Sequence, residues 1–371
     1  MNGYGYLRAQ RALAILLMLV SAALLRAQPT NGPWQSPLRM AWSSDGRTFS
    51  APTMFQDSSG VPSAVLWKGD TLVCAFQWFR APRTAPTWDR VAVKFSYDAG
   101  LTWTEPTPIV IQGMPLQYQR PFDPTLAVVG DTLRLYFSSS DGMPSGGLSD
   151  IVNTYSAIST DGVTYTFEPG ARYDVVDRPI IDPAVVYFRG QWHYAAPRGA
   201  PQEGAHHAVS ADGLLFTPQP PYPSDGQHNW TGNYCLVDDS TLRFYGSGPR
   251  LWYAPSSDAA SWQPYVDIGL QGGDPTVVRV RDDRWLIIYV GPRQTTSVDT
   301  TWIDNITIGP NPTSSSVSIR GLQDDDVVTA FSMLGTPVDA SLHDAAAGTY
   351  VIVVQRGDAR FATRVVKLRN M

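Results

Sequence analysis

The chain has 371 residues, 43% of them hydrophobic, and is long enough for a large core and more than one domain. Its 31 glycines, 30 prolines and 12 tryptophans, with only 16% charged residues, are typical of a turn-rich all-β protein and argue against a helical bundle. The formal net charge of -5 argues against nucleic acid as the main partner.

The first 27 residues have the pattern of a secretory signal peptide. Arg8 and Arg11 precede an apolar run over residues 12–20, and small residues follow as far as Ala27. We expect cleavage after Ala27, with Ala23 as the alternative. The apolar run is shorter than the ~20 residues that cross a bilayer, which disfavours a membrane anchor. No later stretch predicts a transmembrane segment.

A hairpin pattern recurs five times along the following 230 or so residues. In the clearest copy, residues 121–137, apolar residues alternate on both sides of a turn at Gly130-Asp131. The other copies span residues 62–76, 182–194, 233–245 and 274–289. A hairpin repeated in this way predicts a repeat protein.

A second repeat, a short turn centred on an aspartate, alternates with the hairpins. Its copies have Asp45, Asp98, Asp161, Asp212 and Asp258 at their centres, which are 53, 63, 51 and 46 residues apart. Aspartate accepts hydrogen bonds from the backbone ahead of it, and glycine allows a positive φ. The pattern resembles the Asp-box of sialidases and related β-propellers. That resemblance implies a fold and says little about function, because in propellers this turn lies away from the ligand face.

The order of the two repeats predicts how the chain closes. Spacings of this size suit four-stranded propeller blades. The chain starts on a turn and ends on a hairpin, so five pairs close only if the first turn, residues 42–49, joins the last hairpin, residues 274–290. We predict a five-bladed β-propeller over residues 34–300.

The last 67 residues have a different character. Alternating valine and isoleucine predict a small antiparallel β-sandwich. The segment has a Pro-Asn-Pro motif ending at Pro312, a turn at Gly335, Gly348-Thr349-Tyr350, and Val365-Val366-Lys367 near its end. These features, over residues 305–371, resemble the C-terminal sorting domain of the type IX secretion system of Gram-negative bacteria. The resemblance implies that the secretion machinery is a partner and that the chain is exported through the periplasm and released or attached to the cell surface. An ordinary ligand-binding sandwich is the alternative.

Metal and cofactor sites are not expected. Cys74 and Cys235 fall in apolar strands of different repeats, so buried free thiols are favoured over a disulfide. The histidines lack the spacing of metal ligands, and adjacent residues such as His206 and His207 point to opposite faces of a strand.

Candidate site residues gather on the propeller face opposite the turn repeat. Asp123, Asp182 and Asp274 each begin the first strand of a blade and should ring one mouth of the channel; Pro62 and Gly232 or Asn233 match them in the other repeats. The links between second and third strands should reach the same mouth. They and nearby connections contain Trp88, Trp230, His228, Glu203 and four arginines in Pro-Arg pairs, Arg83, Arg198, Arg250 and Arg293. The aspartates could form a structural ring of ion pairs or a ligand pocket with Trp88 and Trp230 as sugar platforms.

The Asp-Pro hairpins resemble those of five-bladed propeller glycosidases of the arabinanase, xylosidase and levansucrase kind. The resemblance implies that Asp182 or Asp123 orients the sugar and that Glu203 is the general acid. The early carboxylate of that family has no counterpart at Pro62, and only Asp57 or Asp89 could replace it. The arginines suit bidentate capture of a carboxylate, which suggests an acidic sugar.

These observations predict a secreted or surface-attached, carbohydrate-active propeller. One hypothesis is a glycoside hydrolase that acts on an acidic glycan. The alternative is a glycan-binding or adhesion module without catalysis.

Overall fold

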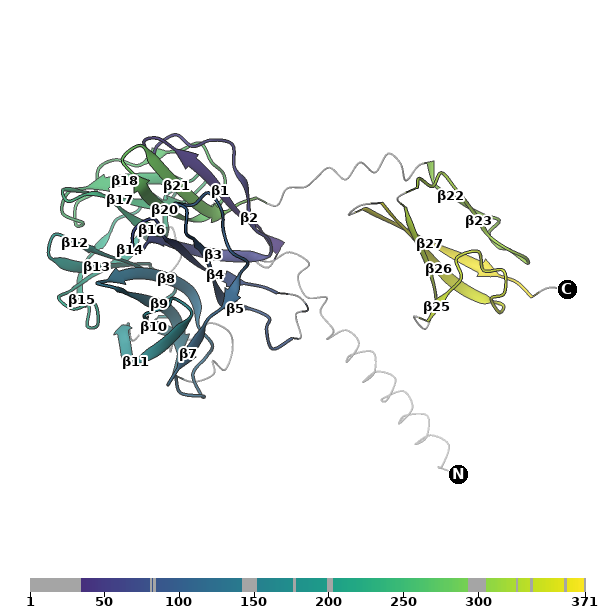
Figure 1. Cartoon of the computed structure of the whole chain (residues 1–371), viewed down its shortest axis with the longest axis horizontal. Coiled ribbons are helices and arrows are strands. Elements are labelled where there is room, and N and C mark those ends of the chain that lie inside the picture. Colours follow the sequence, from purple (N-terminus) through teal and green to yellow (C-terminus); the bar gives the residue numbers. More distant parts are fainter. Residues whose placement is uncertain are drawn as a thin grey trace, which may run out of the picture. The chain divides into compact units, whose positions relative to one another are not determined.

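A computed structural model of the chain describes residues 35–80, 82, 85–141, 152–175, 178–198, 203–292, 305–324, 326–333, 336–356 and 359–369. The chain forms two compact units, Met1–Arg293 and Gln294–Met371 (Figure 1). The expected signal peptide, together with Arg83, Arg293 and Gly335, lies outside the described residues. Within these ranges, no helix has both the length and the apolar character needed to cross a membrane.

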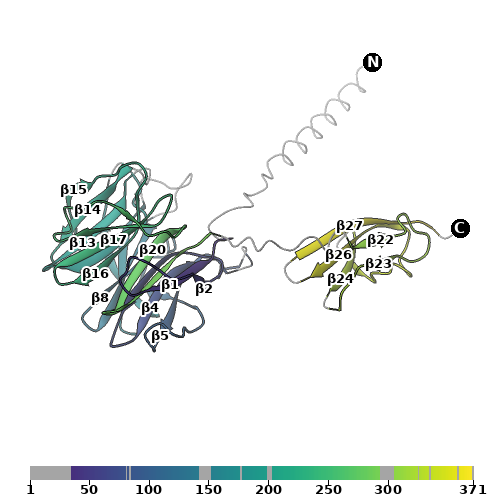
Figure 2. The ribbon, with the colours of Figure 1, turned by 90° about the horizontal axis from the view of Figure 1, so that it is seen from above.

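The first unit consists of five sheets, which we call blades 1 to 5 in chain order of their first strands (Figures 1 and 2). Blade 1 comprises β3 (Ser59–Leu66), β4 (Leu72–Trp78), β5 (Arg90–Ser96) and β6 (Thr107–Pro108). Blade 2 comprises β8 (Phe122–Val129), β9 (Thr132–Ser140), β10 (Val152–Ser159), β11 (Thr164–Tyr173) and an outer parallel strand, β7 (Val110–Gln112).

Blades 3 and 4 follow the same up-and-down order. Blade 3 comprises β12 (Ala184–Phe188), β13 (Gln191–Pro197), β14 (Ala205–Ser210) and β15 (Thr217–Tyr222). Blade 4 comprises β16 (Asn229–Asp238), β17 (Thr241–Ser247), β18 (Trp252–Ser256) and β19 (Val266–Asp267).

Blade 5 is assembled from both ends of the unit. It contains β20 (Gly273–Arg281) and β21 (Arg284–Val290), followed by β1 (Leu38–Ser43) and β2 (Thr53–Gln56). β1 pairs antiparallel with β21, from Leu38 opposite Val290 to Ser43 opposite Trp285. The innermost strands β3, β8, β12, β16 and β20 contact one another in ring order. The predicted five-bladed propeller and its closure are therefore confirmed.

The propeller core lies between neighbouring blades. For example, Val93 and Phe95 of blade 1 pack with Leu133 and Phe137 of blade 2 in one buried cluster. Each such side chain contributes about 1.5–3 kcal/mol when it is fully buried. The alternation of apolar residues in the hairpins reflects this packing, because each blade is covered on both faces.

The aspartate-centred turns join the third and fourth strands of each blade, and we call them the Ser-x-Asp turns. In the blade 2 turn, Ser159 Oγ accepts hydrogen bonds from the backbone N–H groups of Asp161 and Gly162 at 3.2 and 2.8 Å. Asp161 Oδ1 accepts from the N–H groups of Val163 and Thr164 at 2.8 and 2.7 Å. The same kinds of bond form at Asp45, Asp98, Asp212 and Asp258.

The second unit is the small β-sandwich that the sequence predicts. One sheet pairs β22 (Thr307–Gly309) with β23 (Ser318–Arg320), and the other has the order β25 (Pro337–Val338), β24 (Val327–Ser332), β26 (Gly348–Arg356) and β27 (Ala359–Lys367). Ile308 and Ile319 of the first sheet pack against Val328 and Val354 of the second. A role in sorting stays a prediction.

Candidate active site

The innermost strands begin with a repeated backbone irregularity. The pairing register shifts between Gly60 and Ser63 in β3, between Phe122 and Thr125 in β8, and between Gly273 and Thr276 in β20. Asp123 and Asp274 lie within two of these bulges and have φ values of 49° and 48°, and Asp182, just before β12, has a φ of 52°. Positive φ is uncommon outside glycine, and aspartate tolerates it better than most residues. A bulge of this kind redirects the side chain away from the pleat.

The positions that match these aspartates in the other two blades are Val61 and Gly232. Val61 has a φ of 45° and precedes Pro62 as each aspartate precedes its proline, and Gly232 has a φ of 152°. The expected match at Pro62 was therefore wrong by one residue. Alignment on the alternating apolar residues misplaced the match, whereas alignment on the proline that follows each of these positions places Val61 opposite the aspartates.

The three aspartates line one cavity of about 440 Å³, which we call the acidic cavity. The remaining polar lining comes from blade 1 and the start of blade 2, as Gln77, Asp89 and Arg120. Three aromatic residues also line it, Phe79, Trp88 and Phe122. The tilted rings of Phe79 and Trp88 lie 5.6 Å apart. The acidic cavity thus combines four carboxyl groups with aromatic surface.

The carboxyl groups at the centre of the acidic cavity are electrostatically coupled. The backbone N–H of Asp182 donates to Asp123 Oδ2 at 3.3 Å. Burial raises the pKa of Asp123 to about 7, and the nearby charges of Asp274 and Asp89 add to this rise. Burial, the charges of Asp123 and Asp274 and a hydrogen bond with Asp123 raise the pKa of Asp182 well above its ordinary value. The pair therefore retains a proton close to neutral pH.

Asp274 differs from this pair. Burial raises the pKa of its carboxyl group to about 6. Its backbone N–H donates to Ser247 Oγ at 2.8 Å, which fixes the strand start. The three carboxyl groups interact and titrate together, so near neutral pH the set holds both protonated and ionised carboxyls. The acidic cavity therefore contains a proton donor and a proton acceptor at the same time.

Asp89 is the carboxylate of the acidic cavity that is ion-paired. It accepts hydrogen bonds from Gln77 Nε2 and from the Arg120 guanidinium. Arg120 Nε also donates to the backbone oxygen of Asp89 at 3.0 Å. Across the described ranges, no arginine pairs with Asp123, Asp182 or Asp274, so the ring of Asp-Arg pairs that the structural interpretation requires is not observed there.

Gln77 and Arg120 were not predicted as site residues. Gln77 is a polar residue in the otherwise apolar β4, and Arg120 precedes the Pro-Phe-Asp start of β8. A polar residue within an apolar strand and an arginine just before a strand start are the sequence signals by which Gln77 and Arg120 could have been found. Asp89, which was considered as a replacement for the missing early carboxylate, does line the acidic cavity.

The other predicted site residues are distributed over the propeller. Trp88 lines the acidic cavity. Glu203 is exposed and is not part of the lining, so its role as general acid stays a prediction. Arg198 is half-buried, and Arg250 is exposed and donates to the Gly269 carbonyl oxygen at 3.0 Å. Neither arginine lines the acidic cavity.

Two aromatic residues that were predicted to face a ligand, Trp230 and His228, instead contact other residues of the propeller. Trp230 is only 1% exposed and donates through Nε1 to the Pro223 carbonyl oxygen, so its indole has no free face for a sugar. The expectation of a sugar platform at Trp230 is therefore corrected. His228 bonds to Asp225 at 2.6 Å and stacks on Tyr265 with ring centroids 4.4 Å apart. His228 lies outside the acidic cavity lining.

The described residues contain no group of three or more histidine, cysteine, aspartate or glutamate side chains arranged to hold a metal ion. His206 lies against Tyr173, whereas His207 stacks on Tyr222 at 4.5 Å, on the opposite face of β14. Cys74 and Cys235 are free and buried, as expected.

No protein-family model and no curated protein matches the chain. Similar solved structures include a GH32 β-fructofuranosidase of Bombyx mori, at 12% identity over 90% of this chain and 82% of that chain, with a TM-score of 0.49. A GH43_1 enzyme of Xanthomonas citri complexed with xylose has 14% identity over 62% and 81%, with a TM-score of 0.47. A family 117 glycoside hydrolase of Zobellia galactanivorans has 11% identity over 70% and 92%, also with a TM-score of 0.47. Similarities this distant assign no activity to the chain.

Proposed function

We propose that the first unit is a carbohydrate-active propeller that hydrolyses a glycosidic bond in the acidic cavity. The observation that carries this proposal is the meeting of Asp123, Asp182 and Asp274, from three blades, in one cavity where their pKa values are raised to different extents. Glycoside hydrolysis needs two carboxyl groups, one that donates a proton and one that is ionised. Neighbouring carboxyls with different pKa values meet that need.

The proposed mechanism divides these roles between the coupled pair and Asp274. The Asp123–Asp182 pair gives its proton to the leaving-group oxygen as the bond to the sugar breaks. The Asp274 carboxylate takes a proton from the attacking water, whose oxygen bonds to the sugar carbon. The proton that water leaves on Asp274 returns to the pair through solvent. Trp88 and Phe79 supply apolar surface for a sugar ring, and Asp89 with Gln77 offers polar groups to its hydroxyls.

The charges of the acidic cavity favour a neutral glycan. Arg120 is the one guanidinium of the described lining, and Asp89 already pairs with it. Four carboxyl groups therefore face the ligand with no free positive charge among the described lining residues, which opposes a uronic or sialic acid. The acidic glycan suggested by the four predicted arginines becomes the alternative that a substrate screen decides.

The decisive experiment is a reducing-sugar release screen over neutral and acidic polysaccharides. We expect release from a neutral polysaccharide by the wild type, and loss of about 10²–10⁴-fold in rate in Asp182→Asn and Asp274→Asn. Glu203→Gln is the matched control, because this exposed carboxyl lies outside the acidic cavity. Loss of activity in Glu203→Gln with retention in Asp182→Asn would reverse the assignment and restore Glu203 as the acid.

A glycan-binding module without catalysis is the second candidate, and the repetition of the bulge favours it. The same bulge with positive φ occurs in β3, β8 and β20, whether its residue is Val61 or an aspartate. Features that repeat in this way commonly stabilise a fold. Binding on a glycan array that Trp88→Ala weakens, without release of any sugar, would identify this function.

We also propose that the chain is exported by a type IX secretion system. The support is the N-terminal apolar segment, the Pro-Asn-Pro motif, and the Val365-Val366-Lys367 run that ends β27. Expression in a bacterium with this system should place the chain outside the outer membrane. A variant without residues 305–371 should remain in the periplasm, and its appearance outside the cell would contradict the proposal.

A further inference from the structure

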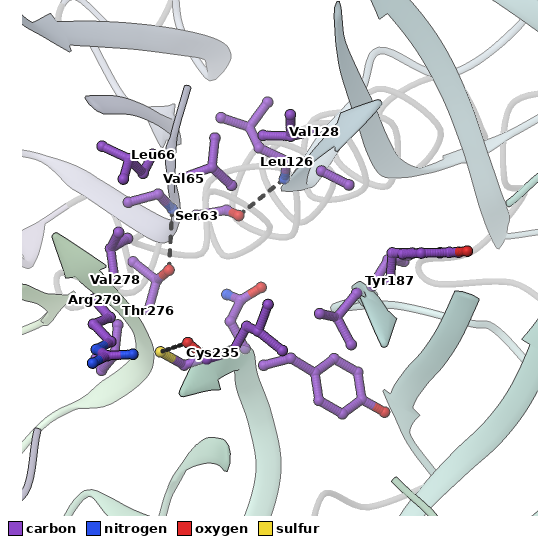
Figure 3. Close-up of a pocket in the computed structure, with 18 of the residues that line it drawn as sticks. Ser63, Val65, Leu66, Leu126, Val128, Tyr187, Cys235, Thr276, Val278 and Arg279 are labelled. Carbon is purple, nitrogen blue, oxygen red and sulfur yellow. Dashed lines mark hydrogen bonds between the residues drawn. The ribbon is translucent and has the colours of Figure 1, made fainter. Parts of the chain in front are cut away.

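The propeller contains a second cavity, which shares no lining residue with the acidic cavity. It has a volume of about 320 Å³ and is lined by residues of all five innermost strands; we call it the channel cavity. Val65, Leu126, Val128 and Val278 give it aliphatic walls. Figure 3 shows these side chains around a common space, with Ser63 and Thr276 on its border. No residue of the proposed catalytic machinery belongs to it.

A hydrogen-bonded layer separates the channel cavity from the acidic cavity. The backbone N–H of Leu126 donates to Ser63 Oγ at 2.9 Å, and that of Ala64 donates to Thr276 Oγ1 at 3.1 Å. Asn233 Nδ2 donates across the channel to the Pro62 carbonyl oxygen at 3.3 Å. These bonds tie β3 to β8, β20 and β16 immediately below the bulges. A ligand therefore reaches the channel cavity from the other end.

The other end of the channel cavity lies on the face of the Ser-x-Asp turns. β3 runs from the bulge to Leu66, and the hairpin that follows is bonded to the blade 1 turn through Ala99 N–H and the Asp70 carbonyl oxygen. The exposed lining residues Val128, Tyr187 and Leu236 form the rim at this end. Apolar side chains thus remain open to solvent around the mouth.

The inner end of the channel cavity presents hydrogen-bond donors. Ser63 and Thr276 are each 2% exposed, and each hydroxyl oxygen accepts a backbone N–H. Among the described residues neither hydroxyl has an acceptor for its own proton. A buried donor without an acceptor costs free energy, so a ligand oxygen at this position is favoured.

Among its described lining residues, the channel cavity has one charged side chain, Arg279, and that side chain is in an ion pair. The Arg279 guanidinium donates through Nη1 to the Val237 carbonyl oxygen and through Nη2 to Asp282, and its buried Nε has no hydrogen-bond partner among the described residues. The Cys235 thiol donates to the Leu236 carbonyl oxygen at 3.8 Å, and burial raises its pKa, so it stays uncharged. The lining offers no carboxylate to a cation, and the guanidinium that could attract an anion already pairs with Asp282, so an uncharged ligand is favoured.

We propose that the channel cavity binds a small uncharged molecule with an apolar body and one hydrogen-bond-accepting oxygen. The apolar body contacts the valine and leucine walls, and the oxygen accepts from the Ser63 and Thr276 hydroxyls. Cavities of this size that bury most of a ligand between apolar walls and a few polar groups are typical small-molecule sites. The inference does not depend on the reaction proposed for the acidic cavity.

Calorimetric titration of the full chain with cyclohexanone, an uncharged acceptor, tests this site. Methylenecyclohexane has nearly the same shape without the oxygen, and we expect it to bind at least tenfold more weakly. Thr276→Val keeps the shape of the side chain and removes the hydroxyl, and we expect about a tenfold loss of cyclohexanone affinity. Asp182→Asn, in the other cavity, should bind as the wild type does.

Val128→Trp provides a test that does not disturb the buried layer. Val128 lies on the rim, so the larger side chain narrows the mouth and should abolish binding while the melting temperature stays unchanged. If Thr276→Val does not fold, Val128→Trp and the pair of probes still decide the question. Equal binding of the two probes, binding that survives Val128→Trp, or no heat of binding up to the solubility limit of cyclohexanone would overturn the proposal.

Discussion

Two sets of aspartates on opposite faces of the propeller have opposite electrostatic character. In the Ser-x-Asp turns, hydrogen bonds from backbone N–H groups and from hydroxyl groups stabilise the carboxylate, and they lower the pKa of Asp161 and Asp212 and bring that of Asp98 to about 2. In the acidic cavity, burial raises the pKa of Asp123 to about 7 and that of Asp274 to about 6. One side-chain type is thus fixed as an anion on one face and partly protonated on the other.

The difference shows that repetition alone does not separate a structural residue from a reactive one. Both sets recur at blade intervals and both depend on a local backbone irregularity. The turn aspartates direct their oxygens at their own backbone, so their hydrogen-bonding capacity is used within the turn. The cavity aspartates have no such turn: Asp123 accepts from the Asp182 backbone N–H, and all three residues line an open cavity. Hydrogen-bonding capacity that is left for a ligand therefore distinguishes the aspartates of the candidate active site from those of the turns.

The largest expected effect is on the rate of hydrolysis, and it comes from replacing an aspartate of the acidic cavity by asparagine. Asp123→Asn removes the shared proton donor, and we expect a loss of about 10²–10⁴-fold in hydrolysis rate. Asp161→Asn, in the turn set, should keep the wild-type rate per folded molecule. Rates are compared by reducing-sugar release at equal folded concentration. A similar loss of rate in both variants would remove the functional distinction between the two faces.

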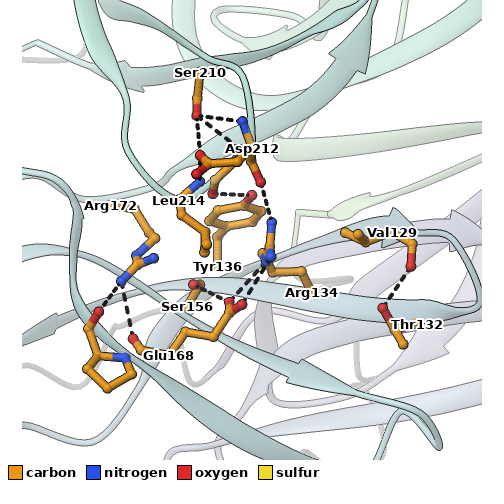
Figure 4. A network of polar contacts seen from close by, with 12 residues as sticks. Val129, Thr132, Arg134, Tyr136, Ser156, Glu168, Arg172, Ser210, Asp212 and Leu214 are labelled. Carbon is orange, nitrogen blue, oxygen red and sulfur yellow. Dashed lines mark hydrogen bonds and ion pairs between the residues drawn. The ribbon is translucent and has the colours of Figure 1, made fainter.

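The next largest effect is on the free energy of unfolding, and it comes from hydrogen bonds between a side chain of one blade and the Ser-x-Asp turn of the next. Arg134 bonds to Glu168 at 2.9 and 3.0 Å, and its Nη1 donates to the Asp212 carbonyl oxygen of the blade 3 turn (Figure 4). Arg134→Ala leaves Glu168 partly buried without its partner, and the free energy of unfolding should fall by about 3–5 kcal/mol.

The matched control for Arg134→Ala is Arg281→Ala, whose pair with Asp70 is more than half exposed. Its loss should change the free energy of unfolding by less than about 0.5 kcal/mol. Urea unfolding followed by tryptophan fluorescence measures both variants. Equal destabilisation would mean that the buried network adds nothing beyond a surface pair.

A smaller effect is expected on how the free energy of unfolding depends on pH, which should differ between the cavity aspartates and the turn aspartates. The pKa of Asp182 is raised in the folded chain, so its contribution to stability is present at low pH and is lost as pH rises through that value. Asp182→Asn removes this loss and should raise the free energy of unfolding at pH 8, with little change at pH 4. Thermal unfolding at both pH values measures it. A variant that is less stable than the wild type at pH 8 would show that the Asp182 carboxylate is stabilising.

The smallest expected effect is the pH-dependent contribution of Asp161 to stability, which changes with pH in the opposite direction to that of Asp182. The pKa of Asp161 is lowered on folding by its hydrogen bonds, so its contribution is present at neutral pH and is lost as pH falls through the lowered value. Asp161→Ala should reduce the free energy of unfolding by about 1 kcal/mol at pH 7 and by less at pH 2.5. A reduction that grows on acidification would contradict the assignment of this turn to the anionic set.

Much of the architecture was predictable because it is local and repeated. Each hairpin encodes its own alternation, and each Ser-x-Asp turn is formed within seven residues, so counting the copies yielded five blades and their closure. The cavity lining was predictable only in part. Asp123, Asp182, Asp274 and Trp88 follow from their places at strand starts and links, whereas the contributions of Gln77 and Arg120 depend on a bulge and on contacts between blades.

The sequence alone therefore determined the number of blades, the closing strand and the face on which the aspartates gather, since hydrogen bonding and burial within one repeat decide these. Tertiary structure decided which side chains reach the cavity. Trp230 is enclosed by rings of two blades, and Val61 occupies a position at which other blades have aspartate. It also decided protonation, because the pKa of a carboxyl group depends on its burial and on the charges that other blades bring near it.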